Sequence, residues 1–373
     1  MVFDMWTVDR TWRWDRPVAL VLGLVLVLLA VGIVASSETA GADEGTPSDF
    51  KVAFIGDQGL SSKALAVLEL IKSEGADMVL HQGDFDYTDS PNAWDQQIND
   101  ILGSDFPYFA SIGNHDGIAW AGYQEKLEAR LDRLDGVTCT GDQGVKSACT
   151  DKGVFFILSG VGMSGSGHDT FIRDQLAASY ATWKICSWHY VQILMQVGDQ
   201  KKNFVGWEPY EECRKGGAIV ATAHEHSYSR THLMANFETQ SIASTSSTLQ
   251  IEKGKSFAFV SGLGGIGIRS QNDALAANPW WAAVYTSRQS ADFGALFCTF
   301  NENGVENRAH CYFKDIGGAV PDQFDLQVTL SSPPAVPGVS TVGLWVIGGA
   351  LAAVVLWSAW RARARVTGAS HRQ

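Results

Sequence analysis

The chain has 373 residues and a formal net charge of −12, and 46% of its residues are hydrophobic. This length and composition allow one large globular domain or two smaller ones, with a sizeable core. The acidic balance argues against a nucleic-acid partner, which normally meets a basic surface. It also repels an anionic substrate unless bound cations reverse the local field.

An uncharged apolar stretch lies near each end of the chain, at residues 17–35 and 339–360, with arginines on its outer side. The length of each stretch suits a transmembrane helix. The first equally suits a signal sequence, with cleavage points near Ala35 or after Ala42. By the positive-inside rule, both chain ends face the cytoplasm if neither is cut, and everything between them faces outside.

These stretches divide the chain into seven segments. We expect a cytoplasmic amino-terminal segment, a first span or signal sequence, a linker, a folded domain, a proline-containing linker, a second span and a basic cytoplasmic tail. Their bounds, in the same order, are 1–16, 17–35, 36–49, 50–315, 316–338, 339–360 and 361–373.

The six cysteines all lie between the two apolar stretches. An even number outside the cytoplasm indicates disulfide bonds, although six cysteines allow 15 connectivities. We expect pairing in sequence order, because the last two cysteines flank a predicted hairpin whose turn covers residues 301–307. The expected pairs are Cys139–Cys149, Cys186–Cys213 and Cys298–Cys311.

Between the stretches, apolar runs of strand length alternate with helical patterns. A strand at 51–55, a helix with its apolar face between Leu60 and Ile71, and a strand at 77–81 form a βαβ unit. Later strands are expected at 107–112, 154–158, 183–188, 218–222, 256–261, 295–300 and 311–313, and later helices at 123–134 and 170–179. This alternation predicts an α/β fold, in which ligands gather beyond the carboxyl ends of the strands.

Polar turns follow five of these strands. They are Gly56-Asp57-Gln58-Gly59, Gly83-Asp84-Phe85-Asp86-Tyr87, Gly113-Asn114-His115-Asp116, the single His189, and His224-Glu225-His226. Their seven oxygen and nitrogen donors exceed what one ion needs but suit two ions that share a bridging carboxylate. Two such metals clamp a phosphoryl group and lower the pKa of bound water. The predicted donors are Asp57, Asp84, Tyr87, Asn114, His189, His224 and His226, with Asp84 in the middle of the set.

These motifs, in this order, resemble those of the calcineurin-like metallophosphoesterases and, more narrowly, of the purple acid phosphatases. The resemblance covers roughly residues 50–315. It implies the family's fold, a β-sandwich of two mixed sheets flanked by helices.

The resemblance also implies roles for the donors. Asp57, Tyr87 and His226 would bind a first metal, typically ferric iron. Asn114, His189 and His224 would bind a second, typically iron, zinc or manganese, and Asp84 would bridge the two. His115 would bind the substrate phosphate or protonate the leaving oxygen. Hard anionic donors suit the ferric ion, and imidazoles suit the softer divalent ion.

The implied function is a membrane-anchored phosphatase with its catalytic domain outside the cytoplasm. It would hydrolyse phosphate monoesters of small molecules by attack of a metal-bound hydroxide. A phosphodiesterase or nucleotidase on the same site is an alternative within the enzyme class. Two others are a phosphate- or metal-binding surface module without catalysis and a structural envelope protein with a vestigial site.

The sequence departs from the family near the fourth and fifth motifs. Tyr190 follows His189 where the family usually has proline, and Ala223 replaces the glycine before His224. The downstream histidines that bind substrate in many members have no counterpart in 191–207. We therefore expect a retained metal site and an altered substrate pocket.

Several other residues invite a functional interpretation. The second Gly-Asp-Gln-Gly, at 141–144, follows no apolar strand, so Asp142 is interpreted as part of a turn in a disulfide loop. Residues 262–267 match the dinucleotide-binding fingerprint but lack the following helix and acidic residue, so a glycine turn near the metal site is favoured. Asp86 is interpreted as a solvated neighbour, and His81 as a core residue or a neighbour of the ligands. His310 is interpreted as structural, and a structural role is also favoured for His168, Arg230 and His232, which are weaker substrate-binding candidates.

Overall fold

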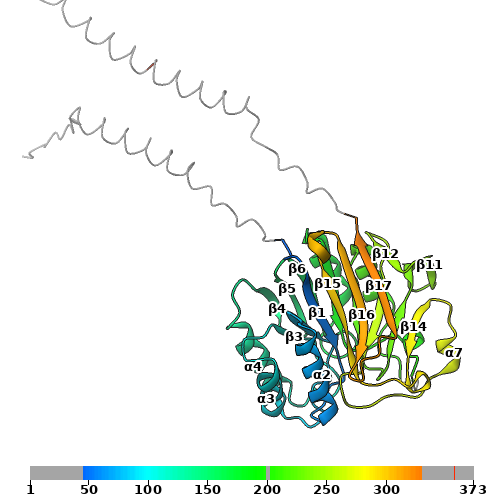
Figure 1. Cartoon of the computed structure of the whole chain (residues 1–373). Helices are drawn as coiled ribbons and strands as arrows, with labels where there is room; N and C mark the ends of the chain where they lie inside the picture. Colours follow the sequence, from blue (N-terminus) through cyan, green and yellow to red (C-terminus); the bar gives the residue numbers. More distant parts are fainter. Residues whose placement is uncertain (1–44, 199–201, 330–356, 358–373) are drawn as a thin grey trace, which may run out of the picture.

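Two β-sheets packed face to face form the centre of the fold (Figure 1). The computed structural model describes residues 45–198, 202–329 and 357. The first sheet has seven strands in the order β12 (Thr248–Ile251), β17 (Asp322–Val328), β16 (Arg308–Asp315), β15 (Gly294–Phe300), β1 (Phe50–Ile55), β2 (Met78–His81) and β3 (Tyr108–Ala110). The second has eight, in the order β14 (Trp281–Tyr285), β9 (Tyr228–Thr231), β13 (Ala258–Ser261), β8 (Ile219–Thr222), β7 (Trp183–Trp188), β6 (Val154–Ser159), β5 (Lys146–Asp151) and β4 (Thr138–Asp142).

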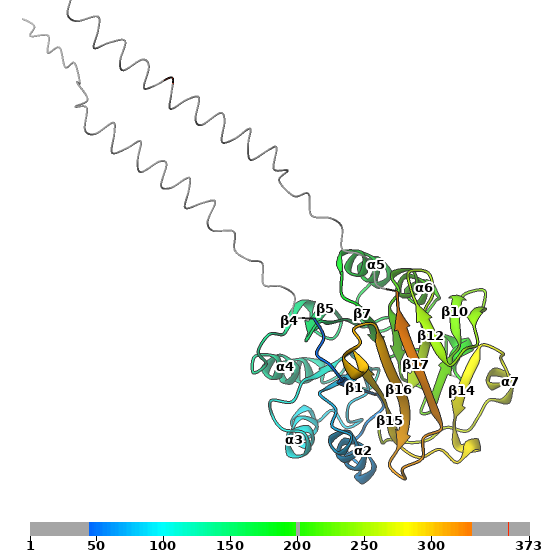
Figure 2. The same cartoon turned by 45° about the horizontal axis from the view of Figure 1, so that its top comes forward.

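Helices cover the outer face of each sheet (Figure 2). On the first sheet lie α2 (Ser62–Ser73), α3 (Pro91–Ile101) and α4 (Trp120–Leu131). On the second lie α5 (His168–Ala178) and α6 (Glu208–Gly216). A further hairpin, β10 (Leu233–Asn236) with β11 (Ser241–Ser244), and the short helix α7 (Asp273–Ala276) lie near β14, at the edge of the second sheet (Figure 2). This arrangement confirms the predicted fold of two mixed sheets flanked by helices.

The main core lies between the two sheets. Strand positions that alternate along the chain point inward, so Phe54 of the first sheet meets Phe259 of the second edge to face, with ring centroids 5.2 Å apart. The other faces of both sheets are also apolar and pack beneath the helices, with Trp94 and Leu127 under the first layer. Burial on both faces explains why the central strands appear as continuous apolar runs in the sequence.

The three disulfide bonds confirm pairing in sequence order. Cys139–Cys149 joins directly opposed residues of β4 and β5, and Cys298–Cys311 does the same for β15 and β16. Cys186–Cys213 ties helix α6 to strand β7. Three disulfide bonds in one domain indicate an extracellular or secreted protein.

The folded domain extends beyond the predicted boundary at residue 315. Strand β17 lies inside the segment 316–338, which the sequence analysis assigned to a linker, and pairs with both β16 and β12. Its inward positions Phe324 and Leu326 are buried, which is the period-two pattern of a strand. Arg230 of β9 forms an ion pair with Asp322 of β17 at 2.7 Å, so this strand also bonds to the opposite sheet.

Helices α3 and α6 were not predicted. The first has a largely polar sequence, but Trp94, Ile98 and Ile101 recur on one face and are buried. The second has few apolar residues and is held by its disulfide and by Tyr210, which is fully buried. Short helices of this kind form because tertiary packing stabilises them, rather than because of strong intrinsic propensity.

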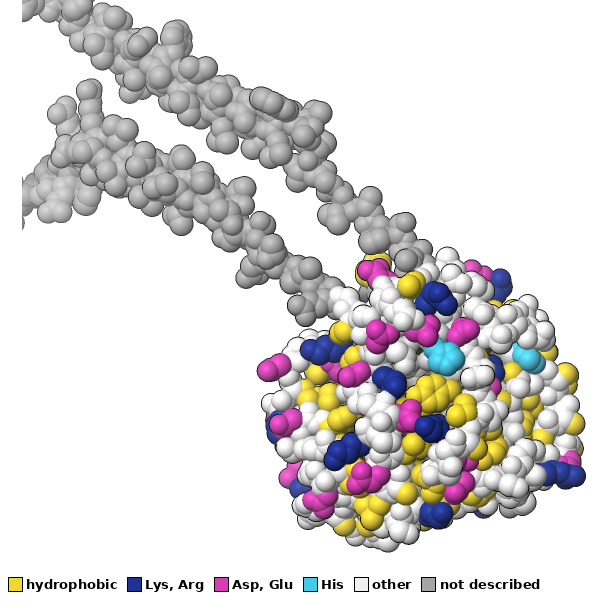
Figure 3. All heavy atoms as spheres, viewed as in Figure 1, with side chains coloured by type: hydrophobic (Ala, Val, Ile, Leu, Met, Phe, Trp, Pro, Cys, Tyr) yellow, Lys and Arg dark blue, Asp and Glu magenta, His cyan; other side chains and the backbone are white. Residues whose placement is uncertain are grey.

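Both ends of the described domain lie at one end of the sandwich, where β1 begins and β17 ends (Figure 1). On the face shown in Figure 3, acidic and basic side chains of the described domain are interspersed. Among the described residues, no helix has both the length and the apolar character that a membrane span needs. The predicted stretches 17–35 and 339–360 lie outside the described residues, apart from residue 357.

Candidate metal centre

The polar turns meet at the carboxyl ends of β1, β2, β3, β7 and β8, opposite the end where the chain enters and leaves the domain. Three backbone bonds join the first turn to the second, from Asp57 N to Gly83 O (3.0 Å), Gln58 N to Asp84 O (3.0 Å) and Gly59 N to Phe85 O (2.9 Å). These bonds hold the turns rigidly side by side.

Four of the predicted ligands have left-handed backbone conformations. Their φ values are 57° for Asp57, 62° for Asp84, 61° for Tyr87 and 67° for His224. Non-glycine residues rarely adopt such angles, because these angles raise the conformational free energy of the backbone. Such residues occur often at functional sites, where the surrounding structure fixes their conformation. Four of the eleven non-glycine residues with positive φ in the described part of the chain are thus predicted metal ligands.

The first group of donors is Asp57, Tyr87 and His226. The Tyr87 hydroxyl donates to Asp57 Oδ1 at 2.8 Å and lies 3.4 Å from His226 Nε2. His226 Nε2 is also 3.4 Å from Asp57 Oδ1. The three donor atoms that the resemblance assigns to one metal thus converge on one point.

The second group is Asn114, His189 and His224. His189 Nε2 lies 3.1 Å from Asn114 Oδ1 and 3.2 Å from His224 Nδ1. The other nitrogen of His189, Nδ1, lies 2.7 Å from the Gln82 carbonyl oxygen, which orients the ring. A second set of three donors therefore converges beside the first.

Asp84 lies between the two groups. Its Oδ2 is 3.3 Å from His189 Nε2, and ligand atoms of Asp57, Asp84 and His189 all lie within 4.8 Å of one another. Its Oδ1 accepts the backbone N–H of His115 at 2.8 Å. Asp84 is thus the carboxylate that adjoins both Asp57 of the first group and His189 of the second.

The electrostatics of the centre favour ionised carboxylates. Burial alone would raise the pKa of Asp84, but the adjacent His189 lowers it to about 2. Burial likewise opposes the charged form of Asp57, yet His226 lowers the pKa of this carboxyl below its ordinary value. Burial lowers the pKa of His189, whereas Asp84 raises it to about 9. The carboxylates are therefore charged and strongly attract cations.

The donor set fits metal ions. Asp57 Oδ2 is buried and accepts no hydrogen bond from the residues that the structure describes, so a charged oxygen lacks a partner that an ion would supply. Two carboxylates, a phenol, an amide oxygen and three imidazoles are also the ligand types that hard and borderline cations take. Asp57, Tyr87 and His226 would hold one ion and Asn114, His189 and His224 the other.

Asp116 is a site residue to which the sequence analysis gave no role. Its buried carboxylate accepts the backbone N–H groups of Gly113 (2.6 Å), Phe85 (2.8 Å) and Asp84 (2.9 Å). Burial, together with the nearby Asp84, raises its pKa to about 7. This one side chain joins the second and third motifs. Its position in the third motif, next to His115, is the sequence feature from which a role could have been predicted.

Gly262 confirms the glycine-turn interpretation of residues 262–267. A side chain there would place Cβ 2.0 Å from the Glu225 carbonyl oxygen and 2.7 Å from Asp57 Oδ2. A Cβ on Gly267 would lie 3.3 Å from His226 Nδ1. These glycines allow the turn after β13 to pack against the predicted metal ligands. Close packing therefore explains the glycine pattern without a bound dinucleotide.

His115 and Tyr190 lie beside the two donor groups. The ring of His115, an exposed residue, is 4.4 Å from that of Tyr87. The ring of Tyr190 packs perpendicular to that of His224 at 4.6 Å and stacks on Phe204 at 4.7 Å. Phe204 is 44% exposed. Tyr190, which replaces the usual proline, thus contributes an aromatic surface next to the second group.

The remaining candidates lie elsewhere or have structural roles. His168 is buried at the start of α5 and lies 2.8 Å from Ser159 Oγ, and Arg230 is paired with Asp322. Asp142 ends β4, at the turn of a disulfide-linked hairpin, as predicted. The interpretation of Asp86 as a solvated neighbour was wrong, because it is buried and accepts the N–H groups of Thr88 and Ser90 before α3.

Comparison with known proteins supports the phosphoesterase resemblance and the fold. Residues 50–228 match the model of the calcineurin-like phosphoesterase family. Among solved structures, the chain is similar to the purple acid phosphatase PPD1 from yellow lupin (Lupinus luteus) seeds, with a TM-score of 0.57 and 16% identity over 79% of this chain and 58% of that one. It is also similar to PhoD, with a TM-score of 0.52 and 13% identity over 80% of this chain and 74% of that one. The comparison with curated proteins found no match.

The folded domain has the calcineurin-like phosphoesterase fold, and its residues 50–228 match that family's model. The chain spans a little over half the length of the lupin enzyme, and at these identities the two structural likenesses show the fold. The family match supports the predicted enzyme class, a hydrolase acting on phosphoric ester bonds.

Proposed function

We propose that this domain is a dinuclear metal-dependent phosphatase that hydrolyses phosphate monoesters of small molecules. The observation that carries the proposal is the division of seven donors into two convergent groups with Asp84 between them. One ion held by one group and Asp84 would leave the three donors of the other group unused, whereas two ions that share Asp84 use all seven. Iron with iron, zinc or manganese suits the ligand types.

Two such ions, when bound, neutralise the charge of a phosphoryl group and activate water for attack on phosphorus. The chain's own residues do the rest. The N–H of His115 fixes Asp84 Oδ1, so the bridging carboxylate keeps its orientation. The exposed ring of His115 is positioned to contact a phosphate oxygen or to give a proton to the leaving alcohol. Asp116 holds the backbone that carries both residues.

A direct test is to measure metal content and turnover on the same preparation of the full-length protein. We expect about two metal ions per chain by elemental analysis and hydrolysis of nitrophenyl phosphate that a chelator abolishes and added metal restores. Two bound ions without turnover of any phosphoester would instead support the non-catalytic binding module. A preparation that binds no metal would favour a vestigial site.

One observation favours the second candidate, a nucleotidase or phosphodiesterase on the same centre. Phe204 is partly exposed, stacks on Tyr190, and has Lys202 Nζ 5.6 Å from its ring centroid. An exposed aromatic face beside a metal ligand can stack on a nucleobase or another flat leaving group. Turnover of nucleoside monophosphates against glycerol phosphate, and of bis- against mono-nitrophenyl phosphate, separates the candidates.

We also propose that the domain is anchored to a membrane with its site outside the cytoplasm. The three disulfide bonds support an oxidising compartment. The predicted segments 17–35 and 339–360 would attach at the end of the sandwich where β1 begins and β17 ends, which leaves the metal centre at the opposite end. Protease added to intact cells should remove the domain, and carbonate washing should leave the uncut chain in the membrane.

A further inference from the structure

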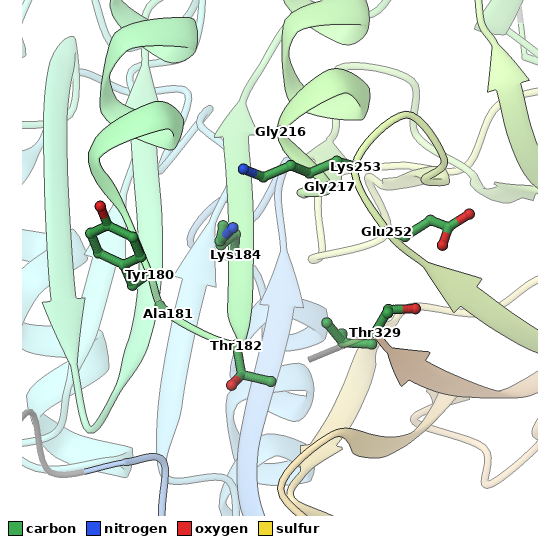
Figure 4. A pocket seen from close by; sticks show the side chains of 10 residues that line it. Tyr180, Ala181, Thr182, Lys184, Gly216, Gly217, Glu252, Lys253 and Thr329 are labelled. Atoms are coloured by element: carbon green, nitrogen blue, oxygen red, sulfur yellow. The ribbon is translucent and has the colours of Figure 1, made fainter. Parts of the chain in front are cut away.

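A cavity of about 290 Å³ lies at the end of the second sheet opposite the metal centre (Figure 4). We call it the basal pocket and define it by its polar lining residues Tyr180, Thr182, Lys184, Glu252, Lys253 and Thr329. Thr182 precedes strand β7, whereas His189 follows it, so the six residues of this strand separate the two sites. At ~3.3 Å per residue, that separation is roughly 20 Å. The basal pocket is therefore no part of the metal centre.

The basal pocket holds two lysines that form no ion pair with a described residue, whereas its one carboxylate, Glu252, is paired with Lys255. Neither Lys184 nor Lys253 has a hydrogen bond or an ion pair with any residue that the structure describes. Other cations near it are paired: Lys255 with Glu252 at 2.7 Å, Lys215 with Glu212 at 2.7 Å, and Arg173 with Asp174 at 3.1 Å. The two lysines that line the cavity are thus the exceptions on this surface.

The position of Lys184 is unfavourable for a lone ammonium group. Its side chain is partly buried, and burial, followed by repulsion from Lys253, lowers its pKa. A partly buried charge without a partner destabilises the protein. An anion between Lys184 and Lys253 would remove both the desolvation cost and the repulsion.

We propose that the basal pocket binds a phosphate group, with the ammonium groups of Lys184 and Lys253 as its main donors. A phosphate dianion matches the two positive charges, and its oxygens can accept hydrogen bonds from the hydroxyls of Tyr180, Thr182 and Thr329, which also line the cavity. The volume approaches the ~300 Å³ of small-molecule sites, so a phosphate with a substituent fits.

The phosphate group has two sources that this chemistry does not distinguish: a soluble phosphate compound and the headgroup of an anionic lipid. Thr329 lines the basal pocket, and the chain continues from it toward the predicted span at 339–360. An adjoining cavity shares Tyr180 and Thr182 with the basal pocket. It is also lined by Gly45 and Thr46, the first described residues at the amino-terminal side of the domain. A headgroup could therefore reach the pocket if the proposed anchors hold this end against a bilayer.

The test uses the full-length chain in detergent, stripped of metal by a chelator so that the metal centre no longer attracts phosphate. Binding of inorganic phosphate is measured by calorimetry, and binding of phosphatidic acid and phosphatidylcholine by native mass spectrometry. Lys184→Met and Lys253→Met should each weaken binding of the phosphate ligand at least tenfold. Lys184→Arg should retain it, because the charge remains.

Lys215→Met is the matched control, since Lys215 adjoins Gly216 of the pocket lining but does not line the cavity itself and is paired with Glu212. It should bind as the unaltered chain does. Lysine-dependent binding of inorganic phosphate identifies a soluble ligand, and lysine-dependent binding of phosphatidic acid alone identifies a lipid headgroup. No binding of either, or equal binding by Lys184→Met and the unaltered chain with the same thermal midpoint, overturns the proposal.

Discussion

The Tyr87 hydroxyl donates a hydrogen bond of 2.8 Å to Asp57 Oδ1. Burial, and next the charge of Asp57, raise the pKa of Tyr87 well above its ordinary value, so the phenol is protonated when no cation is present. A cation between the two oxygens would take the place of that proton. This pair therefore tests whether the domain has the narrower chemistry of a purple acid phosphatase or only the wider family's metal site.

We expect the iron-loaded protein to show a visible absorption band from charge transfer between the Tyr87 phenolate and ferric iron. Tyr87→Phe should remove the band, because no other tyrosine occurs among the predicted ligands. The variant should keep its fold, measured by circular dichroism. A band that persists in Tyr87→Phe would show that another residue supplies the phenolate.

Asp84→Asn should reduce metal content from about two ions to one or none and turnover by at least a hundredfold. The reason is that Asp84 is the carboxylate between the two donor groups, and an amide has no second charged oxygen to bridge them. Asp142→Asn is the control, because the same Gly-Asp-Gln-Gly sequence surrounds it in an exposed hairpin. Full turnover in Asp84→Asn would exclude a bridging role.

Asp116→Ala should lower the free energy of unfolding by about 3 kcal/mol, because three buried N–H groups lose their carboxyl acceptor. It should also weaken metal binding, since all three groups belong to the motifs that hold Asp84 and Asn114. Chemical denaturation with and without metal measures the two effects separately. Unchanged stability in the metal-free protein would mean that water replaces the carboxylate.

Asp322→Ala should destabilise the domain by ~3–5 kcal/mol, because it leaves Arg230 buried without a counter-charge. Asp325→Ala is the matched control three residues along β17, where the pair with His310 is exposed; its effect should stay below ~1 kcal/mol. Urea unfolding gives both values. Equal, small effects would indicate that β17 is dispensable and that the fold ends near residue 315.

Glu211 gives the domain a component of stability that depends on pH. Burial opposes its charged form, but hydrogen bonds from Arg214 and the N–H of Phe237 lower its pKa below the ordinary 4.5. Its contribution is therefore complete above pH 4.5 and lost as the pH falls through the lower, folded-state value. Glu211→Gln should reduce the fall in thermal midpoint over that range. Glu212→Gln is the control, because the Glu212 carboxylate pairs with the exposed Lys215, and this variant should leave the fall in thermal midpoint unchanged.

Much of the centre could be predicted because its donors follow apolar runs of strand length. Asp57, Asp84, His189 and His224 each come just after such a run, and the order of the motifs identified the family. Local patterns also predicted the Cys298–Cys311 hairpin, since directly opposed residues in a hairpin are near in sequence. The sequence did not predict elements such as α6 and β17, because these short, polar segments become ordered through contacts with distant strands.

The sequence by itself determined which chemical groups are present and in what order: the seven donors, six cysteines and five glycine- or histidine-containing turns. Only the tertiary structure decided which groups face one another. It buried Asp86 and Asp116 as acceptors of backbone N–H groups, paired Arg230 with Asp322 across the two sheets, and brought Lys184 and Lys253 to one cavity where neither forms an ion pair with a described residue. Burial and distance set the energy of a charge, and both depend on residues far apart in the chain.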